Sequence, residues 1–277
     1  KNADGNTIVN VTSSSSPGDG ICLDSSDSNT LQEITANFNN RYGIYLDYSN
    51  SNTLQEITAN FNDEGCHNAA LCPGYCGGGI SLDYSNSNTL QNITANSNNV
   101  RGIHLFYSNS NTLTNITANS NNVHGIHLGG SNSNTLTNIT ANFNNQSGIH
   151  LIDSNSNTLQ EITANSNDWH GIILAHSNSN TLTNITANSN DDDGIHLFSS
   201  SSTTLQEITA NSNDGHGIYL LGDSNSNTLQ NITANSNNQS GICLWYANSN
   251  TLQEITANSN GLYGIYIYGD SDNNTIA

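Results

Sequence analysis

The sequence predicts an all-β chain folded as a single right-handed parallel β-helix of about eleven coils. Gly-Ile pairs recur along almost the whole chain, most of them 23 residues apart. Between these pairs, apolar residues alternate with polar ones, as strands with one buried face require. Asn, Ser, Thr and Gly fill the rest of the repeat, and these residues weaken helices. The repeat glycines are Gly20, Gly43, Gly79, Gly102, Gly125, Gly148, Gly171, Gly194, Gly217, Gly241 and Gly264. We therefore expect one β-helix domain over residues 1–277.

Each repeat contains three segments with the pattern of a short strand. Gly-Ile-x-Leu comes first, Asn-Thr-Leu second and Ile-Thr-Ala third. Successive coils should stack as parallel strands about 4.8 Å apart, so that equivalent side chains form columns. In one repeat, the residues expected inside are Ile126, Leu128, Leu136, Ile139 and Ala141.

The corners between these segments are rich in Asn and Gly. Asn tolerates the left-handed backbone of tight corners, and stacked Asn side chains can exchange amide hydrogen bonds. We expect the glycine before each Ile to serve the same need for a positive φ. The period is too short for helical-hairpin repeats, and leucine-rich repeats would need more leucines and a helical segment.

One repeat carries an insertion with three cysteines. The step from Gly43 to Gly79 is 36 residues, which places a Cys-rich loop at about 64–78. A loop without a core of its own needs a staple, so we expect a disulfide inside it. The remaining loop cysteine could pair with Cys22, whereas Cys243 is either free or intermolecular. The disulfide candidates are Cys22, Cys66, Cys72 and Cys76.

The charge balance excludes some partners. The net charge is -19, and the only cationic residues apart from histidine are Lys1, Arg41 and Arg101. So few cations cannot neutralise a phosphate backbone or an anionic membrane surface, so we expect no nucleic acid and no membrane insertion. No signal-peptide pattern is present, and we interpret the chain as a processed, mature product. We expect an extracellular or cell-surface location.

The repeat resembles the NosD-like, carbohydrate-binding and sugar-hydrolysis type of parallel β-helix repeat, including Asn-rich microbial surface proteins. The resemblance covers Asn6 to Ile276. It implies the β-helix fold but leaves function open, because the group contains sugar-cleaving enzymes, a copper-site maturation factor and surface proteins without known activity.

The residues favour a structural role over catalysis. The chain begins and ends within a coil, at segments 6–12 and 274–277, with no amphipathic helix to cover the strand edges. Such edges pair with other chains, so we expect a head-to-tail homopolymer that forms a surface fibre or coat. The alternative is a glycan-binding surface protein or adhesin, for which outward threonine columns such as Thr112 and Thr135 are suited.

Glycans are expected as covalent or bound partners. Asn-x-Ser/Thr motifs occur nine times, five of them at one repeat position that otherwise holds Glu. A position that accepts Glu faces solvent, so its Asn can carry a glycan. The candidate sites are Asn10, Asn92, Asn115, Asn138, Asn145, Asn184, Asn231, Asn238 and Asn273.

Two columns offer metal ligands, although no cofactor is required by the sequence. Asp24, Asp47 and Asp83 follow the Gly-Ile-x-Leu segment on three successive coils, and Ca²⁺ is the candidate ion for such oxygen ligands. Histidines form the second column and suit Zn²⁺ or Cu²⁺. They are His104, His127 and His150, with His196 further on and His124, His170 and His216 beside them. Without a metal, the two columns would be an acidic stripe and a pH-sensitive surface.

A glycoside hydrolase is the minority interpretation. One loop column holds acidic residues and a Gly-His-Gly segment, an arrangement similar to that of polygalacturonases. The resemblance would make Asp192 and Asp193 acid/base carboxylates, Asp168 a partner and His216 an assisting group. The Arg-Ile-Lys segment of that family has no counterpart here. We therefore predict that the chain is not an enzyme.

Overall fold

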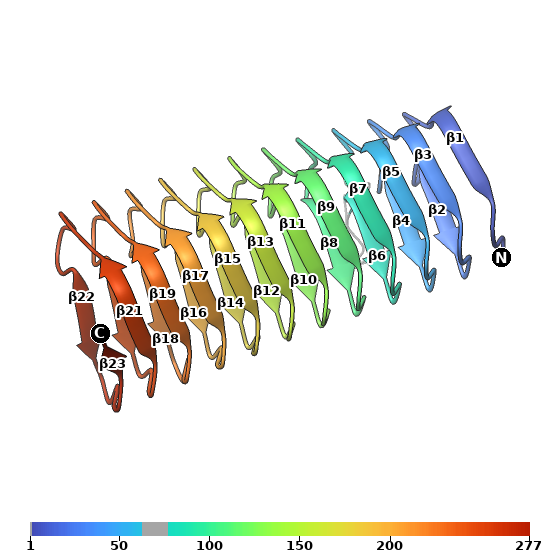
Figure 1. Cartoon of the computed structure of the whole chain (residues 1–277). Helices are drawn as coiled ribbons and strands as arrows, with labels where there is room; N and C mark the ends of the chain where they lie inside the picture. Colours follow the sequence, from blue (N-terminus) through green and yellow to red (C-terminus); the bar gives the residue numbers. More distant parts are fainter. Residues whose placement is uncertain (1, 63–76) are drawn as a thin grey trace, which may run out of the picture. The chain divides into compact units, whose positions relative to one another are not determined.

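The computed structural model describes residues 2–62 and 77–277, and all regular structure in these ranges is β-strand. The strands form a right-handed β-solenoid of about eleven turns, spaced about 23 residues apart, which confirms the predicted fold class (Figure 1). The chain divides into two compact units, residues 1–140 and residues 141–277. Within the described ranges, no helix is long and apolar enough to cross a membrane.

The strands of the first unit are β1 (Thr7–Thr12), β2 (Ile21–Asp24), β3 (Thr30–Thr35), β4 (Ile44–Asp47), β5 (Thr53–Thr58), β6 (Gly78–Asp83), β7 (Thr89–Thr94), β8 (Arg101–Phe106), β9 (Thr112–Thr117), β10 (Ile126–Gly129) and β11 (Thr135–Thr140). The odd-numbered strands form one parallel sheet and the even-numbered strands another. Like residues pair with like, for example Leu31 with Leu54 and Leu46 with Leu82.

The strands of the second unit are β12 (Ile149–Ile152), β13 (Thr158–Thr163), β14 (Ile172–Ala175), β15 (Thr181–Thr186), β16 (Ile195–Phe198), β17 (Thr204–Thr209), β18 (Ile218–Leu221), β19 (Thr228–Thr233), β20 (Ile242–Trp245), β21 (Thr251–Thr256), β22 (Ile265–Tyr268) and β23 (Thr275–Ile276). Here too the odd and even strands form separate parallel sheets, with Leu182 paired to Leu205 and Leu197 to Leu220.

The core contains the residues that the alternation predicts. Ile126, Leu128, Leu136, Ile139 and Ala141 are each at most 1% exposed. The same positions are buried on most other coils, which gives each unit a continuous aliphatic interior. Burial of these side chains is the main force that holds the coils together.

Each coil has two strands rather than the three predicted. The second and third expected segments form one six-residue strand, such as β5, with a residue of positive φ inside it. At Glu56 this angle is 56°. The backbone turns there, so Leu54 and Ile57 both face the core although they are three residues apart. The sequence shows three apolar segments, but it does not show that hydrogen bonding continues through the bend.

The repeat glycines do not have the positive φ that we expected. They are required for space instead. A Cβ on Gly194 would lie 2.6 Å from the carbonyl oxygen of Gly217 and 2.8 Å from that of Ala187. Distances below 3.0 Å are not tolerated, so only glycine permits this approach of neighbouring coils. The positive φ values fall mostly on Ser, Asn, Glu, Asp and aromatic residues at other positions of the coil.

Buried asparagines connect neighbouring coils. The side-chain amide of Asn39 donates to Oδ1 of Asn62 at 3.0 Å, and the amide of Asn62 donates to Oδ1 of Asn98 at 3.2 Å. The backbone N–H groups of Asn39 and Asn62 donate to the same two oxygens, each at 3.0 Å. These bonds satisfy corner groups that would otherwise be buried and unpaired. The predicted Asn ladder is therefore present within the first unit.

The insertion leaves the coil intact. Residues 63–76 lie outside the described residues, and with them Cys66, Cys72, Cys76 and most of the predicted loop. On either side of this segment, β4 pairs with β6 and β5 pairs with β7 in the usual register.

Candidate functional site

A group of four titratable side chains lies at one corner of the second unit. His170 precedes Gly171 and β14, Asp192 and Asp193 precede Gly194 and β16, and His196 lies within β16. Since successive coils stack in register, His170 lies against Asp193 although they are 23 residues apart. We call His170, Asp192, Asp193 and His196 the His–Asp cluster.

Asp193 is the centre of the His–Asp cluster and is 3% exposed. Its Oδ1 accepts the backbone N–H of His216 at 2.7 Å. Its Oδ2 lies 2.8 Å from Nδ1 of His196 and 3.6 Å from Nδ1 of His170. One carboxylate oxygen is thus held by the backbone, and the other faces two imidazoles. A buried carboxylate needs such partners, because an unpaired one would be very costly.

His170 is a buried, neutral imidazole. Burial lowers its pKa to about 4, although the charge of Asp193 opposes this shift. Its Nδ1 accepts the backbone N–H of Asp193 at 3.3 Å. A nitrogen that accepts carries no proton, so the proton of neutral His170 is on Nε2. The Nδ1 lone pair of His170 is therefore the acceptor of this hydrogen bond.

Asp192 is the outer carboxylate of the His–Asp cluster, with its side chain 41% exposed. Partial burial and the neighbouring charge of Asp193 raise its pKa to about 6. Its Oδ2 lies 3.8 Å from Nδ1 of His170. Gly215 makes room for both carboxylates, because a Cβ there would be 2.7 Å from Oδ1 of Asp192 and 2.6 Å from Oδ1 of Asp193.

Aromatic and polar groups surround the His–Asp cluster. Trp169 stacks on His170 with ring centroids 4.9 Å apart, and the ring of His196 lies 4.7 Å from that of His170. Tyr219 contacts His196 edge-on at 5.0 Å. Nδ1 of His196 and Oδ2 of Asp193 lie within hydrogen-bond distance of each other, at 2.8 Å. Among the described residues, it also contains the three side chains, His170, Asp193 and His196, that each place a potential metal-ligand atom within 4.8 Å of the other two.

The residues of the hydrolase interpretation are only partly brought together. Asp192 and Asp193 adjoin, but Asp168 is exposed and aligns with Asp191 rather than with either of them. His216 meets Asp193 through its backbone N–H, while its ring Nδ1 accepts the backbone N–H of Ser240 at 3.1 Å. Burial lowers the pKa of His216. The imidazoles that contact Asp193 are those of His196 and His170, which the sequence placed only in and beside the outward histidine column.

The predicted metal columns are in register within the first unit. Asp24 pairs with Asp47 and Asp47 with Asp83. Burial raises the pKa of Asp83, whose carboxylate accepts hydrogen bonds from Ser81 at 2.9 Å and Tyr45 at 3.2 Å. These protein donors use the oxygens that a Ca²⁺ ion would need. Calcium binding by this column stays a prediction.

The histidine column of the first unit is stacked. The rings of His104 and His127 lie 5.0 Å apart, and that of His124 lies 5.5 Å from His127. Burial, and secondarily the charge of Arg101, lower the pKa of His104 to about 3. His150 belongs to the second unit, so the predicted trio is divided between units.

The predicted glycosylation sites lie on the surface. All nine sequon asparagines are exposed, and Asn115 and Asn138 donate side-chain hydrogen bonds to the asparagine of the preceding sequon at 2.9 Å and 2.8 Å.

The two described cysteines differ in exposure. Cys22 is exposed, and its predicted disulfide partners lie outside the described residues. Cys243 is 1% exposed, and burial raises its pKa to about 12. Such burial favours the free thiol over the intermolecular disulfide.

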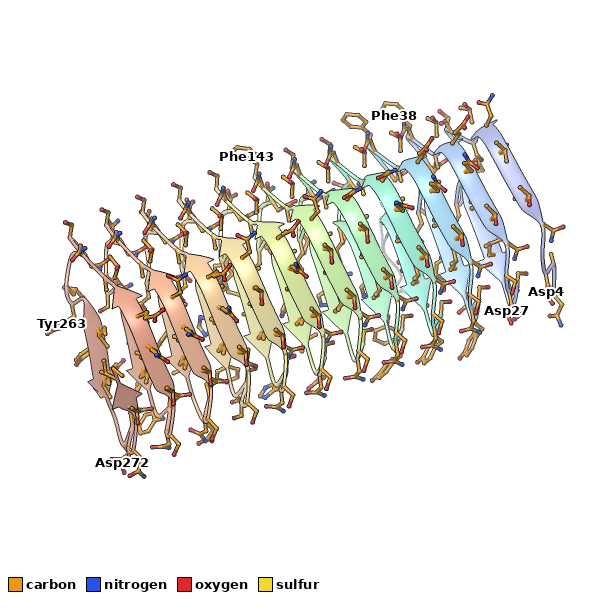
Figure 2. All side chains as sticks on the ribbon, in the orientation of Figure 1. Asp4, Asp27, Phe38, Phe143, Tyr263 and Asp272 are labelled. Carbon is orange, nitrogen blue, oxygen red and sulfur yellow. The ribbon has the colours of Figure 1, made fainter. Side chains whose placement is uncertain are left out.

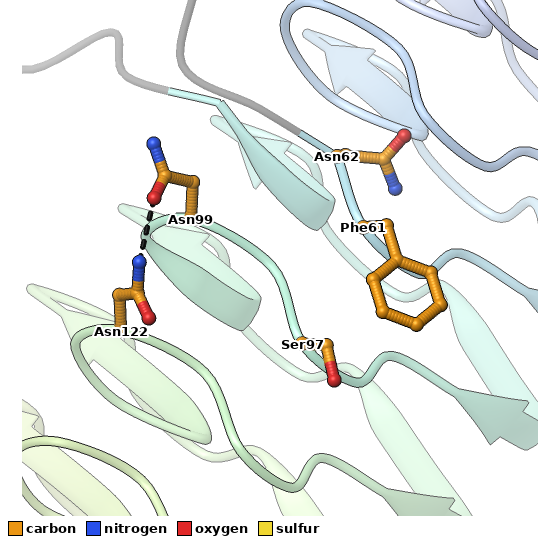
Figure 3. A pocket seen from close by; sticks show the side chains of 5 residues that line it. All are labelled: Phe61, Asn62, Ser97, Asn99 and Asn122. Atoms are coloured by element: carbon orange, nitrogen blue, oxygen red, sulfur yellow. Dashed lines mark hydrogen bonds between the residues drawn. The ribbon is translucent and has the colours of Figure 1, made fainter.

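Exposed aromatic side chains stack on two corners of the first unit. Tyr48, Tyr84 and Tyr107 form a column with ring centroids 4.9 Å and 5.5 Å apart. Phe38 and Phe61 stack at 5.1 Å, and Figure 2 shows the Phe38 ring projecting from its corner. Phe61 also borders a shallow hollow of about 340 Å³ with Asn62, Ser97, Asn99 and Asn122 (Figure 3). These lining residues include no titratable group, so they offer contact surface and no acid–base chemistry.

Comparison with known proteins identifies the fold. The family described as the right-handed beta helix region matches residues 1–161 and 124–277. No curated protein sequence matches the chain.

Solved structures agree with this match at low sequence identity. A variant of the periplasmic alginate epimerase AlgG is 13% identical, with a TM-score of 0.68 over 91% of this chain and 70% of that one. The A-module of the Azotobacter vinelandii mannuronan C-5 epimerase AlgE4 is 14% identical, with a TM-score of 0.62 over 99% and 90%. The Dettilon tailspike protein is 14% identical, with a TM-score of 0.63 over 95% of this chain and 60% of that one. At such identity, these likenesses show the fold alone.

Proposed function

The chain belongs to the right-handed β-helix family, and on that premise we propose that it is an extracellular structural protein. It would be the subunit of a surface fibre or coat that assembles by end-to-end stacking of coils and carries N-linked glycans. The observation that carries the proposal is the repetition of one coil-to-coil interface. The same aliphatic and Asn columns recur at each step, so the upper face of a coil fits the lower face of any other.

Exposed apolar side chains on the first and last strands support axial stacking. In β1, Val11 is in register with the buried Ile34 and is itself 36% exposed. In β22 and β23, Ile267 and Ile276 are 36% and 53% exposed. Joining two such faces is a head-to-tail contact that does not close, and such contacts generate filaments.

Two variants in one strand test the proposed assembly. Val11→Lys places a charge on the inward column, where it would enter the joint between two molecules. Val9→Lys is the matched control, because Val9 lies on the outward column in register with Gln32. Electron microscopy should show filaments for the unmodified chain and for Val9→Lys, but short rods for Val11→Lys. Single rods from the unmodified chain, or filaments from Val11→Lys, would contradict the proposal.

Exposure of all nine sequon asparagines supports the glycan part of the proposal. Coils lie about 4.8 Å apart, so glycans on adjacent coils would collide. Asn92, Asn115 and Asn138 occupy consecutive coils, and at most alternate members should be modified. Intact mass and glycopeptide mapping of the native protein would show this. A mass equal to the bare 29.5 kDa chain would refute modification.

Glycan binding is a second candidate function, which the Tyr48, Tyr84 and Tyr107 column favours. Exposed aromatic faces in a row are suited to stack on successive sugar rings. Alginate epimerases and a tailspike are among the proteins with the same fold. Binding assays against alginate, pectin and neutral glycans should show at least tenfold weaker binding for Tyr84→Ala than for Phe143→Ala, an exposed aromatic of the other unit. Equal binding by both variants would show that this tyrosine column is not the glycan-binding surface.

The same assays address hydrolysis. Asp192, with its pKa of about 6, is the carboxyl suited to act as an acid, and Asp193 is its neighbour. Release of reducing sugar that Asp192→Asn abolishes would establish an enzyme in place of a structural protein. Absence of release from these polymers is the result that the structural proposal expects.

A further inference from the structure

We propose that His170, Asp193 and His196 bind a divalent transition metal ion, of which Zn²⁺ best fits the ligands. Two imidazoles and one carboxylate are a common donor set for zinc that keeps an open coordination position. Nitrogen donors favour zinc or copper over calcium and magnesium, which prefer oxygen. The site is distinct from the acidic and histidine columns of the first unit.

The three candidate ligand atoms lie within 4.8 Å of one another. Oδ2 of Asp193 lies 3.6 Å from Nδ1 of His170 and 2.8 Å from Nδ1 of His196. Donors bound at about 2.0–2.1 Å in a tetrahedral site stand about 3.4 Å apart. The first distance already fits, and a metal there would take the Nδ1 lone pair of His170 in place of the backbone N–H of Asp193. The second distance opens once the metal replaces the hydrogen shared by His196 and Asp193. His196 can make this small movement, because it lies on the outer side of β16 with its side chain 12% exposed.

The surroundings hold the ligands in place, as second-shell groups do at metal sites. The N–H of His216 fixes Oδ1 of Asp193, which leaves Oδ2 directed at the imidazoles. Trp169 packs on the ring of His170. Gly171 donates its N–H to the carbonyl of Asp193 at 3.1 Å, so the backbone fixes the spacing of the two coils.

A further oxygen donor lies beside these three ligands. Oδ2 of Asp192 lies 3.8 Å from Nδ1 of His170, and the Asp192 side chain is partly exposed. This carboxylate is therefore positioned to be a fourth ligand or to orient a bound water. A bound ion would join His170 on one coil to Asp193 and His196 on the next, and so would resist separation of the coils.

Metal content and affinity of matched variants test this site. Chelator-treated protein is titrated with Zn²⁺ by calorimetry, and bound metal is counted by mass spectrometry. His196→Ala removes a ligand, whereas His176→Ala removes an exposed histidine that contacts Phe198 and lies outside the His–Asp cluster. We expect His196→Ala to hold one zinc fewer per chain than His176→Ala. Zn²⁺ should also raise the melting temperature of His176→Ala by more than it raises that of His196→Ala. Equal zinc content and equal melting shifts would overturn the proposal.

Two further measurements keep the outcome specific. The cobalt-loaded protein should show the absorption bands of a site with nitrogen and oxygen ligands, and His196→Ala should remove them. If the spectrum instead shows thiolate charge-transfer bands, the metal is bound by cysteine at another site. Circular dichroism checks that each variant is folded. If His196→Ala is not folded, His196→Gln carries the test, because its amide can still donate to Asp193. Titration with Ca²⁺ should give no binding that depends on His196.

Discussion

The buried Asn ladder of the second unit provides the sharpest test of what holds the coils together. Asn190 is 1% exposed. Its Oδ1 accepts the backbone N–H and the side-chain amide of Asn167 at 3.0 Å each, and its own amide donates to Asn213 at 3.0 Å and to Ala164 at 3.2 Å. Replacing Asn190 with Ala removes all four bonds at once.

The size of the effect follows from the groups left unpaired. Asn190→Ala leaves two buried donors of Asn167 without their acceptor, and each such group costs about 1–3 kcal/mol. We therefore expect the free energy of unfolding to fall by about 2–6 kcal/mol. Asn238→Ala is the control, because Asn238 is exposed and donates one side-chain bond to Asp214. Its effect should stay within about 0.5 kcal/mol.

Urea unfolding followed by circular dichroism measures both variants. Hydrogen exchange of the Asn167 amide gives a local readout, since this N–H loses its partner only in Asn190→Ala. If Asn190→Ala were as stable as Asn238→Ala and the Asn167 amide stayed protected, the ladder would not stabilise the fold, and aliphatic burial alone would have to account for coil stacking.

Three further substitutions test other features of the structure. Thr203 occupies the repeat position that holds Asn180 and Asn227 on the neighbouring coils, and its Oγ1 is buried without a partner. Thr203→Asn should therefore raise the free energy of unfolding by about 1 kcal/mol in the same urea assay. Gly215→Ala should destabilise the protein by about 1–3 kcal/mol through collision with Asp192 and Asp193, whereas Gly18→Ala, with open space at its Cβ, should be nearly neutral; equal effects would refute the crowding. Because the pKa of His104 is lowered to about 3, the unfolded state takes up a proton below pH 6.5 that the folded state refuses. Stability should therefore fall by up to about 1.4 kcal/mol per pH unit between about pH 6.5 and 3, and His104→Gln should remove this part of the pH dependence in acid-unfolding curves.

Much of the fold could be predicted because each repeat carries the same structural information. The spacing of Gly-Ile pairs sets the coil, and the alternation of Leu and Ile sets its interior, as Leu136 and Ile139 show. What failed depends on backbone detail. The positive φ at the position of Glu56 merges two expected strands, and the repeat glycines avoid contact between coils rather than adopt a left-handed backbone.

The His–Asp cluster could be predicted only in part. Its residues belong to two columns that the sequence treats separately, the corner position of His170 and the strand position of His196. They meet because Asp193 turns inward and contacts both, whereas the adjacent Asp192 is half-exposed. Nothing in the run of three aspartates at 191–193 distinguishes the one that is buried. Three-dimensional packing at the corner decides this.

The nearly constant length of most coils also determines how such a protein responds to mechanical force. Parallel strands lie across the solenoid, so a pull on one end of the chain peels away the outermost coil before it loads the next. Each detached coil releases about 23 residues, or about 80 Å of extended chain. The molecule would thus lengthen in nearly equal steps under tension. The coils that have not yet detached would keep their structure.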